Sequence, residues 1–231
     1  MLRLIGFFVL ALILSRVLGF LPIVGPLFAR TGIFGIWITA LLLAWWLSAY
    51  GERMVQRRRD RAELRRLEAV DSPHNHGKAG SLLLAQGRAQ RALPHLRQAF
   101  AGDPESAEWA YRLGDASLRA GRLDDAREAL EHCVGLDEEH AYGAAQMRLA
   151  ETLLAQGEEE RSLEALKVVE RNHGPSPESA YRRGLALKAQ GRKDEAKAAF
   201  GEVSSLASQA VKYQKRAATS WVLRAWFAGL V

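Results

Sequence analysis

The first fifty residues are almost continuously apolar, whereas the rest of the chain alternates apolar and polar positions with a helical period. Residues 32–50 form a segment of 19 residues, none of which has a charged side chain. At about 1.5 Å per residue, such a helix spans roughly 30 Å, the thickness of the hydrocarbon core of a bilayer. Residues 2–21 are similar, except for Arg16, whose side chain can extend to the near interface. Because Pro22 and Pro26 supply a turn between the two segments, we predict a transmembrane helical hairpin.

Each predicted span has an alternative. Residues 2–21 could instead be a cleaved signal peptide with Met-Leu-Arg as its charged start, but no convincing small-x-small cleavage site follows them. Residues 32–50 could be a buried helix of a soluble domain, but they lack a polar stripe that would face water. Trp45, Trp46 and Tyr50 lie near one end of this segment, where aromatic rings favour the membrane interface.

Charge is distributed unevenly. The net charge of +6 divides into +5 for residues 1–72, −3 for residues 73–208 and +4 for residues 209–231. Seven arginines follow the second apolar segment: Arg53, Arg57, Arg58, Arg59, Arg61, Arg65 and Arg66. Because basic residues beside a span stay in the cytoplasm, we expect the chain after residue 52 on the cytoplasmic face of a bacterial inner membrane, with 52–72 as a basic helical stalk. The alternative is a nucleic-acid patch, but the arginines lack interleaved aromatic residues for base stacking.

The remainder of the chain repeats itself. Four glycines end helix-like runs at spacings of 34, 36 and 34 residues: Gly87, Gly121, Gly157 and Gly191. A small residue comes seven positions before each: Gly80, Gly114, Ala150 and Gly184. A larger apolar residue comes nine positions after each: Leu96, Leu130, Leu166 and Phe200. We expect each turn glycine to take the left-handed conformation that ends a helix, and each small residue to let a second helix approach closely. The register predicts a helical repeat.

This pattern resembles the tetratricopeptide repeat (TPR) family, in which each repeat of 34 residues forms a pair of helices. The unit 107–140 matches best, through Trp109, Leu113, Gly114, Gly121, Ala126 and Leu130. The resemblance implies an all-α solenoid over residues 73–208, with units 73–106, 107–140, 143–176 and 177–208. It also implies a right-handed superhelix whose concave face, lined by the first helices, holds a partner peptide or helix. Ser72 and Pro73 predict the N-cap and the first residue of its first helix.

The third and fourth repeats depart from the pattern. Ser162 replaces the usual alanine, and two extra residues precede Gly143. We expect an altered packing angle there.

The family's inner-face positions predict the partner-binding groove. They are Tyr111, Asp115, Leu118, Met147, Glu151, Leu154, Tyr181 and Leu185. Tyr111, Met147 and Tyr181 are the expected anchors for an apolar or helical protein segment; the alternative is that they pack only against neighbouring repeats. Gly77 and Ser81 stand where some family members carry the Lys and Asn that clamp a C-terminal carboxylate, so we do not expect that recognition mode.

The tail, residues 209–231, is predicted to be one amphipathic helix. It is rich in large apolar side chains, among them Trp221, Trp226 and Phe227, and it has no acidic residue. It either caps the last repeat or contacts a membrane or partner.

Catalytic and metal-binding motifs are not found in the sequence. One cysteine excludes an internal disulfide and a cysteine-only zinc site, and Cys133 fits a packing position. The six histidines lack ligand spacing and are expected at the surface, and no phosphate loop or nucleophile elbow occurs. We therefore expect no enzyme, cofactor or metal, but an inner-membrane adaptor that binds proteins. The alternative is a dedicated subunit of an envelope pathway, in heme supply, cytochrome maturation or lipopolysaccharide control, since the two-span layout resembles HemY-like heme-associated TPR proteins.

Overall fold

The computed structural model describes Val9, residues 32–211 and residues 215–230, and all regular structure in these residues is α-helical. The helices are α3 (Gly32–Glu68), α4 (Pro73–Ala85), α5 (Ala89–Gly102), α6 (Ala107–Arg119), α7 (Leu123–Leu136), α8 (His140–Ala155), α9 (Glu159–His173), α10 (Pro177–Ala189), α11 (Lys193–Gln209) and α12 (Lys215–Leu230). The chain divides into two compact units, Met1–Arg66 and Leu67–Val231.

The first unit contains most of α3, which runs without interruption through the predicted second span and most of the predicted stalk. The seven arginines that follow the apolar segment are all exposed on this helix. In the part of the chain that the structure describes, none of the helices carries an apolar run long enough to cross a bilayer. The predicted first span, residues 2–21, and the turn after it lie outside the described residues, apart from Val9.

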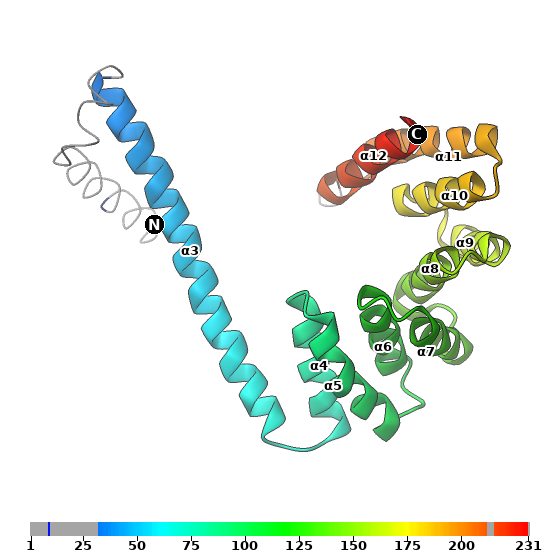
Figure 1. Ribbon diagram of the computed structural model, residues 1–231, viewed down its shortest axis with the longest axis horizontal. Coiled ribbons are helices and arrows are strands. Elements are labelled where there is room, and N and C mark those ends of the chain that lie inside the picture. Colours follow the sequence, from blue (N-terminus) through cyan, green and yellow to red (C-terminus); the bar gives the residue numbers. More distant parts are fainter. Residues whose placement is uncertain (1–8, 10–31, 212–214, 231) are drawn as a thin grey trace. The chain divides into compact units, whose positions relative to one another are not determined.

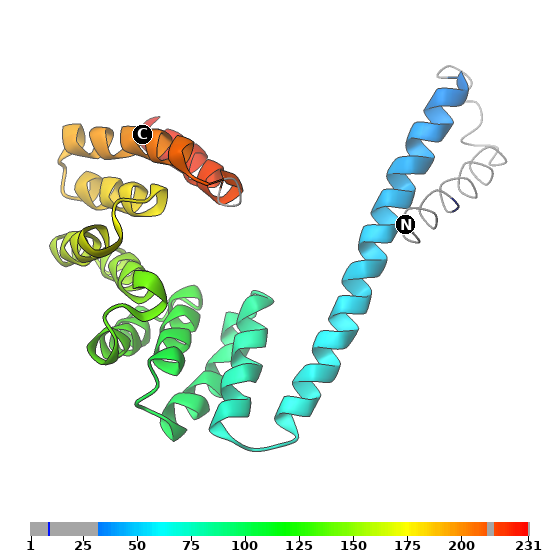
Figure 2. The same ribbon diagram turned by 180° about the vertical axis from the view of Figure 1, so that it is seen from behind.

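The second unit is a row of helix pairs. α4 packs on α5, α6 on α7, α8 on α9 and α10 on α11, and each pair contacts the next. The first helices also contact one another, α4 with α6, α6 with α8 and α8 with α10. The pairs follow an arc, with α4, α6, α8 and α10 along its inner side and α5, α7, α9 and α11 along its outer side (Figures 1 and 2). This is the all-α solenoid that the repeat pattern predicts.

Serine caps start three of the four inner helices. The Oγ atoms of Ser72, Ser106 and Ser176 accept hydrogen bonds from the backbone N–H groups of Asn75, Trp109 and Ser179, each three residues further on. Pro73 is the first residue of α4, where its missing N–H costs nothing. The prediction for Ser72 and Pro73 is confirmed.

The glycines perform the two roles that their spacing predicts. The four turn glycines, Gly87 to Gly191, have φ between +73° and +78°, the left-handed region in which a side chain is strained. An ideal Cβ added at Gly80, Gly114 or Gly184 would lie 2.5 Å from the facing leucine or phenylalanine. The two helices of these pairs therefore approach each other more closely than an alanine would allow.

The third repeat is built differently. Ala150 occupies the place of the close-approach glycine, and the Ser162 hydroxyl donates a buried hydrogen bond of 2.7 Å to its carbonyl. The two extra residues, Ala141 and Tyr142, have φ of 51° and 57° and are followed by Gly143 at 75°. The insertion thus forms a left-handed turn at the start of α8.

The chain does not continue as one helix from residue 209 into the tail. Ala210 ends α11 in an extended conformation, and α12 begins at Lys215. The prediction of a single helix over 209–231 is therefore wrong at its start. α12 packs on α10 and α11, where Ala225 is buried in the same apolar cluster as Phe200 and Val203. The Nζ of Lys188 donates a 2.7 Å hydrogen bond to the carbonyl of Ala228 near the end of α12.

Candidate protein-binding groove

A row of alternating charges connects the inner helices. Arg148 on α8 lies 3.3 Å from a carboxylate oxygen of Asp115 on α6 and 2.6 Å from Glu151. Arg182 on α10 lies 2.9 Å from the same carboxylate of Glu151 and 2.7 Å from Glu178. Each arginine therefore joins two neighbouring repeats, and the row Asp115, Arg148, Glu151, Arg182 crosses three inner helices.

Two predicted groove residues, Asp115 and Glu151, belong to this row. The Asp115 side chain is 5% exposed and is also paired with Arg119 at 2.9 Å. Burial would raise the pKa of Glu151, but the Arg182 and Arg148 guanidinium groups outweigh it and hold that pKa below its ordinary value. Neither carboxylate is a free acidic group, because each is paired with an arginine from the neighbouring repeat.

Three other predicted groove residues pack against the apolar cluster of the last repeat. Leu154, Tyr181 and Leu185 pack against the apolar cluster that α12 completes with Trp221. The Tyr181 ring centroid is 5.5 Å from that of Trp221. The inner face of the last repeat is thus covered by the chain's own helix, and these residues do not form an open surface.

The remaining predicted groove residues are not covered as completely. Tyr111, Leu118 and Met147 are half-buried. Tyr111 packs against the cluster of Leu130, Leu149 and Leu153, and burial, followed by the Asp115 charge, raises the pKa of its hydroxyl. Its ring and Met147 nevertheless keep a face toward a pocket of about 280 Å³.

This pocket lies between α6, α8, the end of α9 and the loop that leads from α9 into α10. Its lining includes Tyr111, Tyr142, Ala144, Met147, Arg148 and Glu178. Tyr142, from the two-residue insertion, is 89% exposed. A left-handed conformation costs a residue with a side chain roughly 1–2 kcal/mol, so the fold holds this aromatic ring outward at an energetic cost. Inner-face positions alone did not predict Tyr142; the broken 34-residue period was the available signal.

The histidines and Cys133 have structural surroundings. His74, His132 and His173 are exposed as expected, but His76, His95 and His140 are half-buried, so the surface prediction is wrong for these three. The nearest ring nitrogens of His76 and His95 are 3.2 Å apart. Burial raises the pKa of the Cys133 thiol to about 11, which suits a packing role. In the described part of the chain, no group of three or more His, Cys, Asp and Glu side chains could hold a metal ion.

Comparison with known proteins agrees with the repeat pattern. The tetratricopeptide repeat family matches residues 83–133 and again residues 177–210. A crystal structure of MamA is 22% identical, with 65% of this chain and 84% of that chain covered and a TM-score of 0.59. MamA from Desulfovibrio magneticus RS-1 is 18% identical, with 69% and 96% covered and a TM-score of 0.54. A thermophilic TPR protein of Thermus thermophilus is 18% identical, with 79% and 97% covered and a TM-score of 0.56.

No curated protein matches the chain. At these identities, the similar structures show the fold, and the family matches identify the repeats within it. The chain therefore contains tetratricopeptide repeats, and its array is similar in fold to the TPR proteins MamA and that of Thermus thermophilus.

Proposed function

We propose that this chain is a scaffold that holds a partner protein segment on the inner side of its repeat array. The observation that carries the proposal is the pocket between α6, α8, the end of α9 and the start of α10, where Tyr111 and Met147 form an apolar wall and Tyr142 is exposed. Helical repeat proteins commonly bind partners along such concave surfaces. Because Arg148 and Glu178 at the pocket already have ion-pair partners, an apolar or amphipathic segment, a peptide or a helix, fits it better than a strongly charged one.

The scaffold is proposed to be anchored in the bacterial inner membrane, with its array in the cytoplasm. The support comes from the apolar residues 2–21 and 32–50 and from the arginines that follow them, seven within about 17 residues of the second segment. A phosphatase fused after Val231 should be inactive in cells and a cytoplasmic reporter active. The reverse result would overturn this orientation.

The groove is tested by site-specific photocrosslinking in cells. A photoreactive phenylalanine analogue at Tyr142 should trap the partner, because this ring is exposed at the pocket. The same analogue at Lys167 is the matched control, since that side chain is 68% exposed on the outer helix α9. Equal crosslinking from both positions would contradict the groove assignment.

Two substitutions at Tyr142 separate binding from folding. Tyr142→Asn removes the ring but keeps a residue that tolerates the left-handed conformation, so it should lose the partner while helix content is unchanged. Tyr142→Phe keeps the ring and should retain the partner. If Tyr142→Asn binds as the unaltered chain does, the pocket is not the binding site.

The breadth of the crosslinked set decides between two kinds of scaffold. The resemblance of the two-span layout to HemY-like proteins favours a dedicated subunit of one envelope pathway. A set of crosslinked proteins confined to one pathway would support that role, whereas a varied set would indicate a general adaptor.

A further inference from the structure

The C-terminal helix α12 has two apolar faces. Ala218, Trp221, Val222 and Ala225 lie on the inward face, and the last three of them pack with the final repeat. The outward face carries Leu223, Trp226 and Phe227, which are 57%, 60% and 63% exposed. Only the inward face of α12 packs on the array, so capping does not explain why Leu223, Trp226 and Phe227 are apolar.

The outward residues form one patch. Leu223 lies three positions from Trp226 and four from Phe227, which places them on the same side of a helix. The Trp226 and Phe227 ring centroids are 4.9 Å apart in an edge-to-face arrangement. Contiguous exposed apolar side chains of this size mark a surface that contacts something else.

Positive charge borders the patch on α12 itself. Lys215 and Arg216 are exposed in its first turn, and Arg224 is exposed beside the patch, with its guanidinium 4.7 Å from the Trp221 ring centroid. Residues 209–231 contain no Asp or Glu. The apolar side chains are therefore accompanied by cations without compensating acids on this helix.

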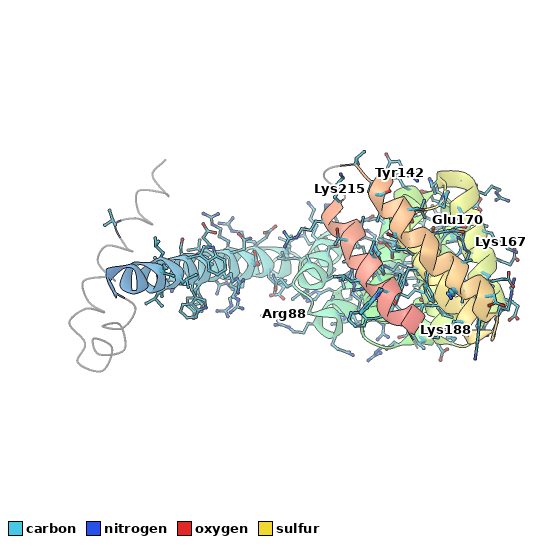
Figure 3. The ribbon with its side chains drawn as sticks, turned by 90° about the horizontal axis from the view of Figure 1, so that it is seen from above. Arg88, Tyr142, Lys167, Glu170, Lys188 and Lys215 are labelled. Carbon is cyan, nitrogen blue, oxygen red and sulfur yellow. The ribbon has the colours of Figure 1, made fainter. Side chains whose placement is uncertain are left out.

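Three lysines from the last repeat lie near the C-terminal end of α12. Lys188, Lys193 and Lys197 line a hollow that also includes Ala228 and Gly229, with Asp194 as its one acidic residue. Figure 3 shows Lys215 and Lys188 near the two opposite ends of the helix. Cations thus lie near both ends of the patch.

We propose that the outward face of α12 binds an anionic lipid surface, with Leu223, Trp226 and Phe227 in the headgroup region and the flanking cations on lipid phosphates. Large apolar side chains combined with Lys and Arg are the composition of helices that lie in a membrane interface. Trp in particular favours the interface. This contact is separate from the inner-side groove and does not depend on a partner there.

The test uses the full chain in lipid nanodiscs and reports on α12 alone. An environment-sensitive fluorophore is attached at Ser220→Cys, which is exposed one turn before Leu223. The control label is at Lys167→Cys on α9. Native Cys133 is fully buried, so labelling selects the introduced cysteine.

In phosphatidylglycerol discs, the label at position 220 should shift to shorter wavelength and be quenched by nitroxide lipids, whereas the label at position 167 should not. Both effects should be weak in phosphatidylcholine discs. Neutralising the cations, as in Lys215→Gln with Arg216→Gln, should lower the equilibrium constant for contact between α12 and lipid about fivefold per charge, which is measured as weaker quenching at position 220. Trp226→Ser with Phe227→Ser should abolish the quenching without changing helix content, because both side chains are exposed.

Two outcomes would overturn the inference. Quenching at position 220 no greater than at position 167 would show that α12 does not contact lipid. Protection of position 220 that is equal in both lipids and in detergent would assign the patch to a protein contact instead. Loss of the chain from all discs would count against the N-terminal anchor, and the same labels with phosphatidylglycerol vesicles would then decide the inference about α12.

Discussion

The close approach of paired helices makes Gly114→Ala the sharpest test of the fold. An ideal Cβ at Gly114 on α6 would lie 2.5 Å from Cγ and 2.8 Å from Cδ2 of Leu130 on α7. Leu130 is fully buried, so it cannot move aside without disturbing its neighbours. We therefore expect the added methyl group to force the two helices apart and to destabilise the array.

The magnitude follows from two opposing effects. Ala is favoured over Gly in a helix interior by about 1 kcal/mol, whereas an extra methyl group in a packed core costs about 1–3 kcal/mol. The net expected effect at Gly114 is a loss of stability of up to about 2 kcal/mol. Gly201 in α11 is the matched control, because an added Cβ there meets no atom within 4 Å. Gly201→Ala should therefore stabilise the chain by about 0.5–1 kcal/mol.

The assay is urea unfolding of both variants, followed by far-ultraviolet circular dichroism. The gain in helix propensity is common to both substitutions, so the difference between them isolates the packing cost. Because repeat arrays need not unfold in one step, amide exchange of α6 and α7 should show the loss at Gly114 locally. The reasoning is refuted if Gly114→Ala stabilises the chain as much as Gly201→Ala does.

Four further predictions concern charges, the thiol and a turn. Arg182→Met leaves partly exposed carboxylates without their buried partner and should cost about 1–3 kcal/mol in urea unfolding, whereas Lys167→Met on the surface should change stability by less than about 0.5 kcal/mol. The lowered pKa of Glu151 stabilises the fold at neutral pH. This contribution is lost as the pH falls below 4.5, the ordinary pKa of the group, and through the lower pKa of the folded state. The difference in unfolding free energy between the unaltered chain and Glu151→Gln should therefore shrink in that range. Cys133 should react with iodoacetamide far more slowly at pH 8 in the folded than in the urea-unfolded chain, because it is buried and its pKa is about 11. Gly121→Ala should lower stability by about 1 kcal/mol, because its φ is +75°.

The repeat period predicted the helix pairs because it reflects contacts between residues close in sequence. A turn glycine is required by the left-handed conformation of its own backbone. A close-approach glycine is required by the side chain that faces it from the next helix, about sixteen positions later. Residue type and spacing were therefore enough to predict Gly80, Gly114 and Gly184. The period carries a further signal for the charged row, since a basic residue comes two positions before each small residue: Lys78, Arg112, Arg148 and Arg182.

The sequence by itself determined the all-α repeat architecture, its turns and the inner side on which a groove would lie. Only the tertiary structure decided which inner-side residues remain open. Tyr181 is covered because Trp221 of α12, 40 residues further along the chain, packs on it. Asp115 and Glu151 are neutralised because arginines from adjacent repeats come within ion-pair distance. Burial and charge pairing depend on everything that surrounds a side chain in space, and spacing along the chain does not specify those neighbours.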